Sequence, residues 1–252
     1  MRPYQSIIYQ CLHKLPNSRI RQSPATALNT KSCQRHLSSA KHYDLNTFIH
    51  HATSTALSPA STVHVGTSYE YLCAHTLPRL GFRNLTRTGG RSDRGIDVLG
   101  HWESPSLAAT GNEGGLHVIV QCKANARKAG PEMIRELEGA VAGAPGEWRG
   151  EGTIGVLCAR REATDGVRQA VRRSERGIVW IMIEDGGGEG KEGKVRQILW
   201  NERVGKQIGR RVGAGLRYVV GNKGMEKEVY LTLDGRVWEP EVGRDTPSAT
   251  PK

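Results

Sequence analysis

The middle of the chain alternates between short apolar segments and segments with helical spacing, and this alternation limits the folds that it can adopt. Segments 117–124, 153–159 and 177–185 are apolar, rich in β-branched residues and bounded by polar ones, which is typical of buried strands. Segments 131–143 and 165–176 carry apolar residues at helical intervals. Strands separated by helices predict an α/β fold, with a central mixed sheet flanked by helices.

Further elements are expected on both sides of this region. A helix is predicted over 67–80, followed by strands over 82–88 and 96–100. Residues 101–116 are interpreted as a flexible insertion that closes a hairpin between the strands 96–100 and 117–124. Beyond residue 194, three short strands predict a β-rich extension in the form of a meander: 195–200, 215–221 and 228–240.

The charge of the chain is unevenly distributed. The formal net charge is +11, which favours a nucleic-acid partner. Residues 1–37 carry six basic residues and no acidic one, whereas the rest carries 30 basic and 25 acidic residues. A basic, acid-poor, Ser-rich leader that can start as an amphipathic helix is typical of a mitochondrial transit peptide, and Arg35 precedes a processing-like position near Leu37. The alternative is a basic arm that stays attached.

The predicted organisation has five parts and no membrane span, because no apolar run is long enough to cross a bilayer. The parts are a transit peptide over 1–37, a linker over 38–62, a folded domain over 63–185, a β-rich extension over 186–240 and a polar tail over 241–252. The five cysteines are widely spaced and form no CxxC pair, so we expect free thiols rather than a zinc site or a disulfide framework.

Charged and polar residues interrupt the predicted strands at three positions. In strand 117–124, Gln121 and Lys123 share one face with Ile119, because side chains alternate along a strand. Asp97 on the preceding strand can meet them across the hairpin, and Glu70 lies on the apolar side of the helix 67–80. Two carboxylates, an amide oxygen and an ammonium group predict a site for a hard cation with an adjacent acid/base group.

A family resemblance accompanies these residues. The motifs Gly66-x-x-x-Glu70, Gly81-Phe82, Gly89-Gly90-x-x-Asp93-x-Gly95-Ile96-Asp97-Val98, Val120-Gln121-Cys122-Lys123 and Glu136-x-x-Gly139-Ala140 occur in this order. Over residues 64–185 the chain resembles the Mrr-like branch of the restriction-endonuclease-like PD-(D/E)xK superfamily. With its leader it is similar to the fungal mitochondrial "required for respiratory growth" proteins that carry this domain.

The resemblance implies a restriction-endonuclease-like core and roles for the site residues. Asp97 is the implied central ligand of Mg²⁺ or Mn²⁺, with Glu70 as a second ligand or a partner through water. Gln121 and the backbone carbonyl of Cys122 complete the implied ligand set, and Lys123 orients or deprotonates the attacking water. Gln121 replaces a carboxylate found in many relatives, which implies weaker metal binding. Asp93 is interpreted as a turn former with a site role as the alternative.

Two functions follow from this interpretation. The first is a metal-dependent nuclease of the mitochondrial matrix that acts on nucleic acid, with DNA favoured, and supports genome maintenance or respiratory growth; a homodimer is compatible with it. The second is a nucleic-acid-binding or scaffolding protein that keeps the nuclease fold with little or no turnover. Six arginines are expected either to contact phosphate or to form a solvated face: Arg160, Arg161, Arg168, Arg172, Arg173 and Arg176.

Overall fold

The structure is a computed structural model, and it describes residues 42–88, 95–110, 115–124, 129–150, 152–186, 192–221 and 224–240. The predicted transit peptide, Asp93 in the glycine-rich turn and the predicted tail lie outside these residues. The first elements are α2 (Leu45–Ser54), α3 (Thr62–Thr76), η1 (Leu77–Leu80), β1 (Phe82–Arg87), β2 (Val98–Trp102), α4 (Pro105–Ala109), β3 (Leu116–Lys123) and α5 (Glu132–Ala142). They are followed by η2 (Gly146–Trp148), β4 (Thr153–Ala159), α6 (Asp165–Arg173), β5 (Gly177–Glu184), β6 (Lys194–Trp200), α7 (Glu202–Ile208), β7 (Val212–Gly221), β8 (Gly224–Leu233) and β9 (Arg236–Trp238).

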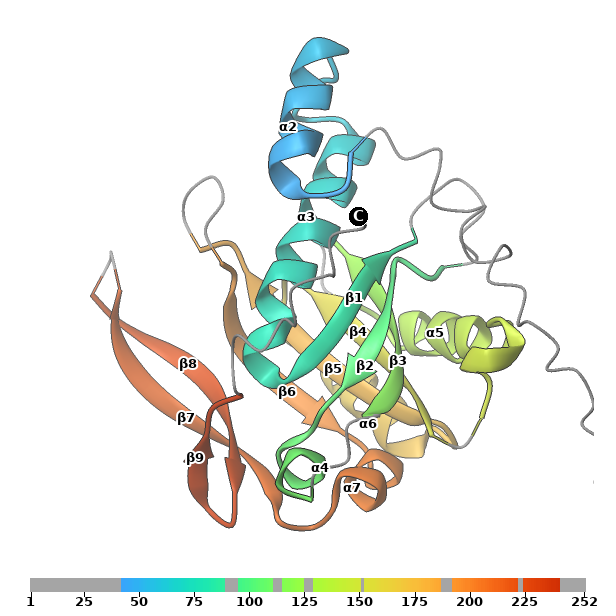
Figure 1. Cartoon of the computed structure of the whole chain (residues 1–252), viewed down its shortest axis with the longest axis vertical. Coiled ribbons are helices and arrows are strands. Elements are labelled where there is room, and N and C mark those ends of the chain that lie inside the picture. The colour runs from blue at the N-terminus through green and yellow to red at the C-terminus, as the bar shows by residue number, and fades with distance from the viewer. Residues whose placement is uncertain are drawn as a thin grey trace, which may run out of the picture. The chain divides into compact units, whose positions relative to one another are not determined.

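The central sheet has six strands in the order β1-β2-β3-β4-β5-β6 (Figure 1). Strands β3, β4 and β5 are parallel, and the remaining neighbours are antiparallel. Parallel neighbours need a crossover, which α5 provides between β3 and β4 and α6 provides between β4 and β5. The predicted mixed α/β sheet flanked by helices is confirmed.

Two apolar layers lie on opposite faces of this sheet. On one face, α3 packs its buried residues Leu72 and Cys73 against alternate residues of β3 such as Val118 and Val120. On the other face, α5 and α6 pack against Ile119 and the alternate residues of β4 and β5. The burial of all seven residues of β4 follows from this double cover. Gln121 and Lys123 therefore belong to the face that α5 covers.

The predicted linker 38–62 is wrong over residues 45–54, where the structure has helix α2. Asp44 and Thr47 form a capping box at its start, with a 2.7 Å bond from the Thr47 N–H to the Asp44 carboxylate. Phe48 and Ala52 are buried against Tyr71 of α3. Helix α3 likewise begins at Thr62 rather than at residue 67, because Ser61 is its N-cap. These apolar contacts are too few to give the segment a clear periodicity in the sequence.

The predicted division at residue 185 is also wrong, because β6 belongs to the central sheet. Strand β6 pairs antiparallel with β5, and its Val195 and Ile198 join the same core as Val179 and Ile181 of β5. The β-rich extension begins only at β7, where β7, β8 and β9 form a separate three-stranded antiparallel meander. The structure also adds α4 within the predicted flexible insertion and α7 after β6.

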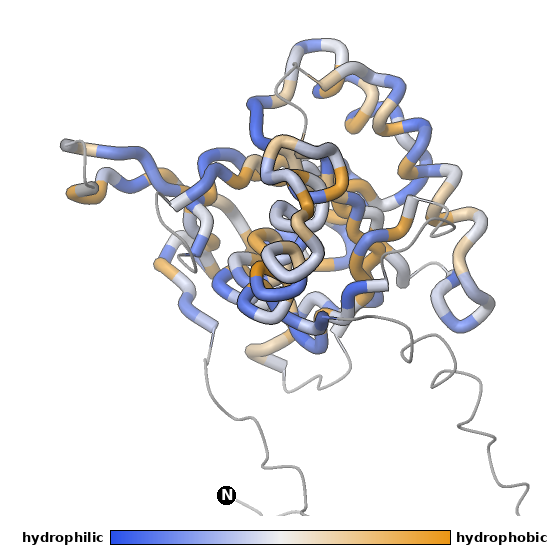
Figure 2. Tube along the Cα trace, turned by 90° about the horizontal axis from the view of Figure 1, so that it is seen from above, coloured by the Kyte–Doolittle hydropathy of each residue, from blue (hydrophilic) through white to orange (hydrophobic). Residues whose placement is uncertain are grey.

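The β7–β8 hairpin carries exposed apolar side chains toward its tip. In Figure 2, hydrophobic (orange) residues occur along the backbone of the projecting arm. Val220 is 87% exposed and Met225, its register partner, is 65% exposed. Within the residues that the structure describes, no helix is both long enough and apolar enough to span a membrane.

Candidate functional site

The predicted site residues lie where several strands of the six-stranded sheet begin or end, along one edge of the sheet. At this edge β1 ends opposite the start of β2, with Arg87 paired to Val98, and β3 ends beside the end of β4, with Lys123 paired to Ala159. Asp97 directly precedes β2, whose first residue pairs with β3 one position before Gln121. The topology therefore brings Asp97, Gln121 and Lys123 to one edge, as their spacing in the hairpin predicts.

Asp97 is held firmly by the two neighbouring segments. Its backbone N–H donates to the carbonyl of Val120 at 3.0 Å, and its carbonyl accepts from the N–H of Thr88 at 2.9 Å. Its Oδ2 accepts a 2.6 Å hydrogen bond from the backbone N–H of Cys122. This bond fixes the orientation of the carboxylate, which has about four acceptor positions on its two oxygens.

The predicted start of the strand 96–100 is wrong. Strand β2 begins at Val98 rather than at Ile96, and Ile96 and Val98 pack in the cores on opposite faces of the sheet. Asp97 lies between these two residues, where the regular alternation of side chains is interrupted. The physical reason is that its side chain takes the Cys122 N–H and thereby replaces a regular backbone partner.

Gln121 is the most unusual residue of the edge. It is only 5% exposed, and its Oε1 is buried without a hydrogen-bond partner among the described residues. The side chain lies against Gly95, where an added Cβ would approach Nε2 to 2.9 Å. Gly95 also has φ +78°, which other residues rarely adopt. A buried acceptor without a donor costs about 1–3 kcal/mol, so this oxygen calls for a ligand.

Lys123 reaches helix α5. Its Nζ lies 2.9 Å from Oε2 of Glu136, and the two side chains are 25% and 54% exposed. Sequence reasoning gave Glu136 no role beyond its place in a family motif. An ammonium group has three donors, and an exposed ion pair is held only weakly. Glu136 therefore orients Lys123 at this edge and leaves its ammonium group able to contact a further group.

Glu70 is largely buried, as its helical position predicts, but it already forms an ion pair with Arg87. Its Oε2 lies 2.5 Å from Nε of Arg87 at the end of β1, and the two side chains are 15% and 18% exposed. Arg87 also stacks over the ring of Tyr71, 5.4 Å from its centroid. Glu70 thus comes from α3, on the other face of the sheet from Gln121, and is linked to the edge through Arg87.

The oxygen atoms at this edge are suitable ligands for a hard cation. Asp97 offers carboxylate oxygen, Gln121 offers an amide oxygen without a donor, and Glu70 and the Cys122 carbonyl are further oxygens from neighbouring elements. Mg²⁺ and Ca²⁺ are bound by oxygen ligands of these kinds. The buried Gln121 oxygen fits such an ion best, because a bound cation would take the place of the hydrogen-bond donor that this oxygen lacks.

Sequence reasoning missed two further features near this edge. Arg160, which follows β4, places its guanidinium 4.9 Å from the ring centroid of Tyr69. Three cysteines that are far apart in the sequence also meet: Sγ atoms of Cys73, Cys122 and Cys158 all lie within 4.8 Å of one another. Burial raises the pKa of the Cys73 thiol well above its usual value. The only signal in the sequence is that Cys122 and Cys158 fall on neighbouring predicted strands.

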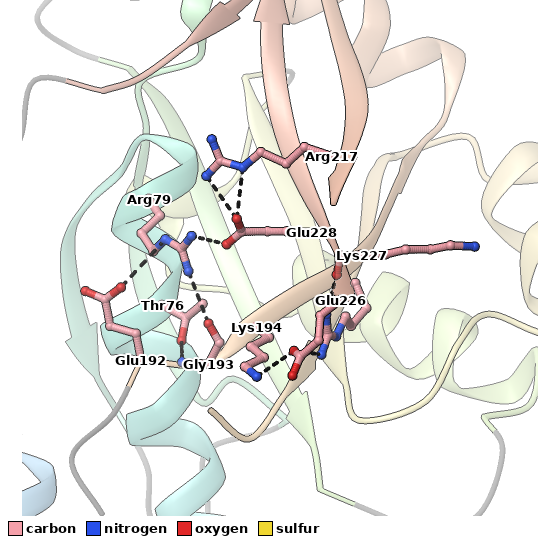
Figure 3. Close-up of polar contacts among 10 residues, drawn as sticks. Thr76, Arg79, Glu192, Gly193, Lys194, Arg217, Glu226, Lys227 and Glu228 are labelled. Atoms are coloured by element: carbon pink, nitrogen blue, oxygen red, sulfur yellow. Dashed lines mark hydrogen bonds and ion pairs between the residues drawn. The ribbon is translucent and has the colours of Figure 1, made fainter. Parts of the chain in front are cut away.

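A second polar cluster, the intersheet ion network, joins the meander to the central sheet and to η1 (Figure 3). Its members are Arg79, Glu192, Lys194, Arg196, Arg217, Glu226 and Glu228, together with Glu184. Glu228 is 8% exposed and accepts from both Arg79 and Arg217. Lys194 and Arg196 of β6 bind Glu226 of β8 at 2.5 and 2.7 Å.

The electrostatics of the network follow from this pairing. Burial alone would raise the pKa of Glu228, but the guanidinium groups of Arg79 and Arg217 hold it below its usual value. Hydrogen bonds from Lys194 and Arg196 lower the pKa of Glu226 in the same way. The network therefore contains matched charges that fix one sheet on the other.

Comparisons with known proteins agree on one family. The family model described as "Required for respiratory growth protein 7" matches residues 61–116 and 105–208, which is more than half of the chain. A mitochondrial protein of Schizosaccharomyces pombe, described as uncharacterized, is 28% identical over 166 residues. The match covers 66% of this chain and 62% of that protein, and no solved structure matches. These findings confirm the predicted mitochondrial localisation. The chain belongs to the required for respiratory growth protein 7 family.

Proposed function

We propose that the protein is a metal-dependent nuclease with a restriction-endonuclease-like core, which hydrolyses phosphodiester bonds in mitochondrial nucleic acid, with DNA as the favoured substrate. The observation that supports it most is the buried Gln121 oxygen without a donor, at the edge that also holds Asp97 and Lys123. A structural glutamine would be expected to satisfy that atom. The resemblance of the motifs around these residues to Mrr-like endonucleases supports the same reaction.

The metal ligands of this proposal are Asp97, the Gln121 oxygen and the Cys122 carbonyl, with Glu70 as a further ligand or a partner through water. When bound there, Mg²⁺ or Mn²⁺ supplies Lewis-acid stabilisation of phosphate charge and a more acidic water. The Cys122 N–H fixes the Asp97 carboxylate. Glu70 contributes directly only after it is released from Arg87, so it has the smaller role of the two carboxylates.

Lys123 acts on the phosphate side of the reaction. Its ammonium group donates to a phosphoryl oxygen and stabilises the charge that develops there, while Glu136 holds the side chain toward the edge. Glu136 is half exposed and can release Lys123 when the phosphates of a nucleic acid arrive. Arg160 and Arg161 directly follow Ala159, the register partner of Lys123, and in this proposal they bind neighbouring phosphates, Arg160 from the α3 side of the sheet.

The alternative is a nucleic-acid-binding protein without turnover, and specific observations favour it. Lys123 and Glu70 are both engaged in ion pairs, and a neutral amide stands where many relatives carry a carboxylate. Such a protein would still bind phosphate through its arginines. Binding and cleavage must therefore be measured side by side to separate the two functions.

The test uses Asp97→Asn and Lys123→Ala, with the exposed Lys206→Ala on α7 as a matched control. Cleavage of linear, branched and modified DNA and of RNA is measured with Mg²⁺, with Mn²⁺ and with chelator. We expect each site variant to lose about 100-fold or more in rate, since positioned charge stabilisers and acid/base groups contribute that much. Nucleic-acid affinity should change little, and Lys206→Ala should match the wild type.

If the wild-type protein binds these substrates but shows no metal-dependent cleavage, the nuclease proposal is wrong and the binding function is supported. Equal loss of binding and cleavage in both site variants would show instead that Asp97 and Lys123 bind nucleic acid and that the reacting groups lie elsewhere.

A further inference from the structure

Three thiols meet in the core on the face of the sheet that α3 covers. Cys122 and Cys158 are register partners on the parallel strands β3 and β4, and Cys73 comes from α3. Their Sγ atoms all lie within 4.8 Å of one another. Cys73 and Cys158 are buried, whereas Cys122 is partly exposed.

The distances suit a metal ion with sulfur ligands. With Zn–S bonds of about 2.3 Å, three thiolates around one ion lie about 4 Å apart. Closing the present group to that size requires side-chain shifts of less than about 1 Å. Thiols are also the ligands that select Cu(I) and Zn(II) over hard cations.

The surroundings favour a cation in this position. The Asp97 carboxylate binds the backbone N–H of Cys122 and therefore places a negative charge beside the group. Cys122 and Lys123 are consecutive on β3, so their side chains project to opposite faces. The thiol group and the Gln121–Lys123 edge are thus separate sites that share one strand.

The simplest alternative is that the thiols only fill the core, since free cysteine behaves as a small apolar residue. That role explains one buried cysteine on each element, but it does not require three thiols from three elements to converge. We propose that Cys73, Cys122 and Cys158 bind one thiophilic d¹⁰ cation, either Zn(II) or Cu(I). This site is independent of the proposed Mg²⁺ site and of nuclease activity.

Binding through three thiolates releases three protons, one from each S–H group, and leaves the site with a charge of −1 for Zn(II) or −2 for Cu(I). Affinity should therefore rise with pH, because each ligand must lose its proton. The metal also ties α3 to β3 and β4, and this should stabilise the folded chain by an amount that rises with the logarithm of the metal concentration.

The experiment uses the full chain with Cys11→Ser and Cys33→Ser, so that the three thiols of the group are the only ones left. The reduced, metal-free protein is titrated anaerobically with Zn(II), Co(II) and Cu(I) against chromophoric chelators. We expect one ion per chain, a sulfur-to-cobalt charge-transfer band, proton release and a higher melting temperature. The Zn(II) and Cu(I) arms decide which metal binds more tightly.

Cys122→Ser is the first ligand variant because its position is partly exposed and tolerates a hydroxyl group better than the buried positions. It should weaken metal binding at least 10-fold, and adding Cys73→Ser should abolish the cobalt band. Lys206→Ala is the control, since this exposed side chain on α7 lies outside both proposed sites and should leave the cobalt band in place. Circular dichroism establishes that each variant is folded.

Either of two results would overturn the proposal. The reduced parent protein could remain folded and free of stoichiometric metal in all three titrations. The folded double variant Cys73→Ser, Cys122→Ser could instead bind metal as tightly as the parent protein, which would place the metal elsewhere.

Discussion

The two polar clusters of this protein differ in how completely their charges are matched. In the intersheet ion network, Glu228 accepts from two guanidinium groups, and Glu226 binds both Lys194 and Arg196. At the sheet edge, by contrast, the Gln121 oxygen is buried without a donor among the described residues. A fully matched network stabilises the fold, whereas an unmatched buried oxygen costs free energy until a water molecule, an ion or another group satisfies it. We propose that the contrast separates a structural cluster from a functional one.

The largest expected effect on stability comes from the network. Arg79→Ala removes one of the two partners of the buried Glu228, and we expect the free energy of unfolding to fall by about 2–3 kcal/mol. Chemical denaturation measures this change. Arg211→Ala is the matched control, because it breaks the exposed pair with Asp234 in the same meander and should have no measurable effect. Equal losses in both variants would show that burial of Glu228 is irrelevant.

The site should respond in the opposite direction. Gln121→Leu replaces the unmatched amide with an apolar side chain of similar size, so the chain should be unchanged or about 1 kcal/mol more stable. The same variant should lose metal-dependent cleavage. Gln197→Leu is the matched control on β6, because Gln197 accepts a 2.8 Å bond from the Ala163 N–H. That variant should lose about 1 kcal/mol. A comparable loss for Gln121→Leu would mean that its amide is structural.

A smaller effect is expected from acid. The pKa values of Glu226 and Glu228 are lowered in the folded state. Lowered carboxyl pKa values contribute stability that is present above the unfolded value of about 4.3 and is lost as the pH falls through the folded values. Amides of β7–β9 should therefore lose hydrogen-exchange protection below about pH 4, before those of β4.

The same acid titration sharpens the comparison when it is repeated on Arg79→Ala. Without this guanidinium the pKa of Glu228 should be less depressed, so the variant should lose less stability between neutral pH and pH 3 than the wild type. Identical pH dependence of stability in the two proteins would show that Glu228 does not contribute to the loss of stability in acid.

Much of the central sheet could be predicted from the sequence because its strands are apolar on both faces. Segment 153–159 matches β4, and 177–185 matches β5 to within one residue. Helix α2 could not be predicted in this way, because it buries only Phe48 and Ala52 and its capping box supplies much of its definition. The place of β6 was missed for another reason, since sheet membership depends on a pairing with β5 that no local pattern records.

The site could be predicted only in outline. Alternation along β3 correctly places Gln121 and Lys123 on one face, and the hairpin brings Asp97 beside them. The partners of these residues could not be inferred, because Glu136 and Arg87 approach from other elements. The meeting of Cys73 with Cys122 and Cys158 depends on how α3 packs over the sheet, and sequence spacing carries no record of that packing.

The most direct measurement of the central claim is the binding of Mn²⁺ to the folded protein, followed by electron paramagnetic resonance as free Mn²⁺ disappears. Wild-type protein and Arg79→Ala, kept under conditions in which both are folded, should each bind one Mn²⁺ with similar affinity. Asp97→Asn should lose this binding because it removes the negative charge of the main ligand, and Gln121→Leu should weaken it by about 10-fold or more because it removes an oxygen ligand. Equal Mn²⁺ binding by wild-type protein and Asp97→Asn, or none by either, would contradict the claim that the unmatched edge of the sheet is a metal site.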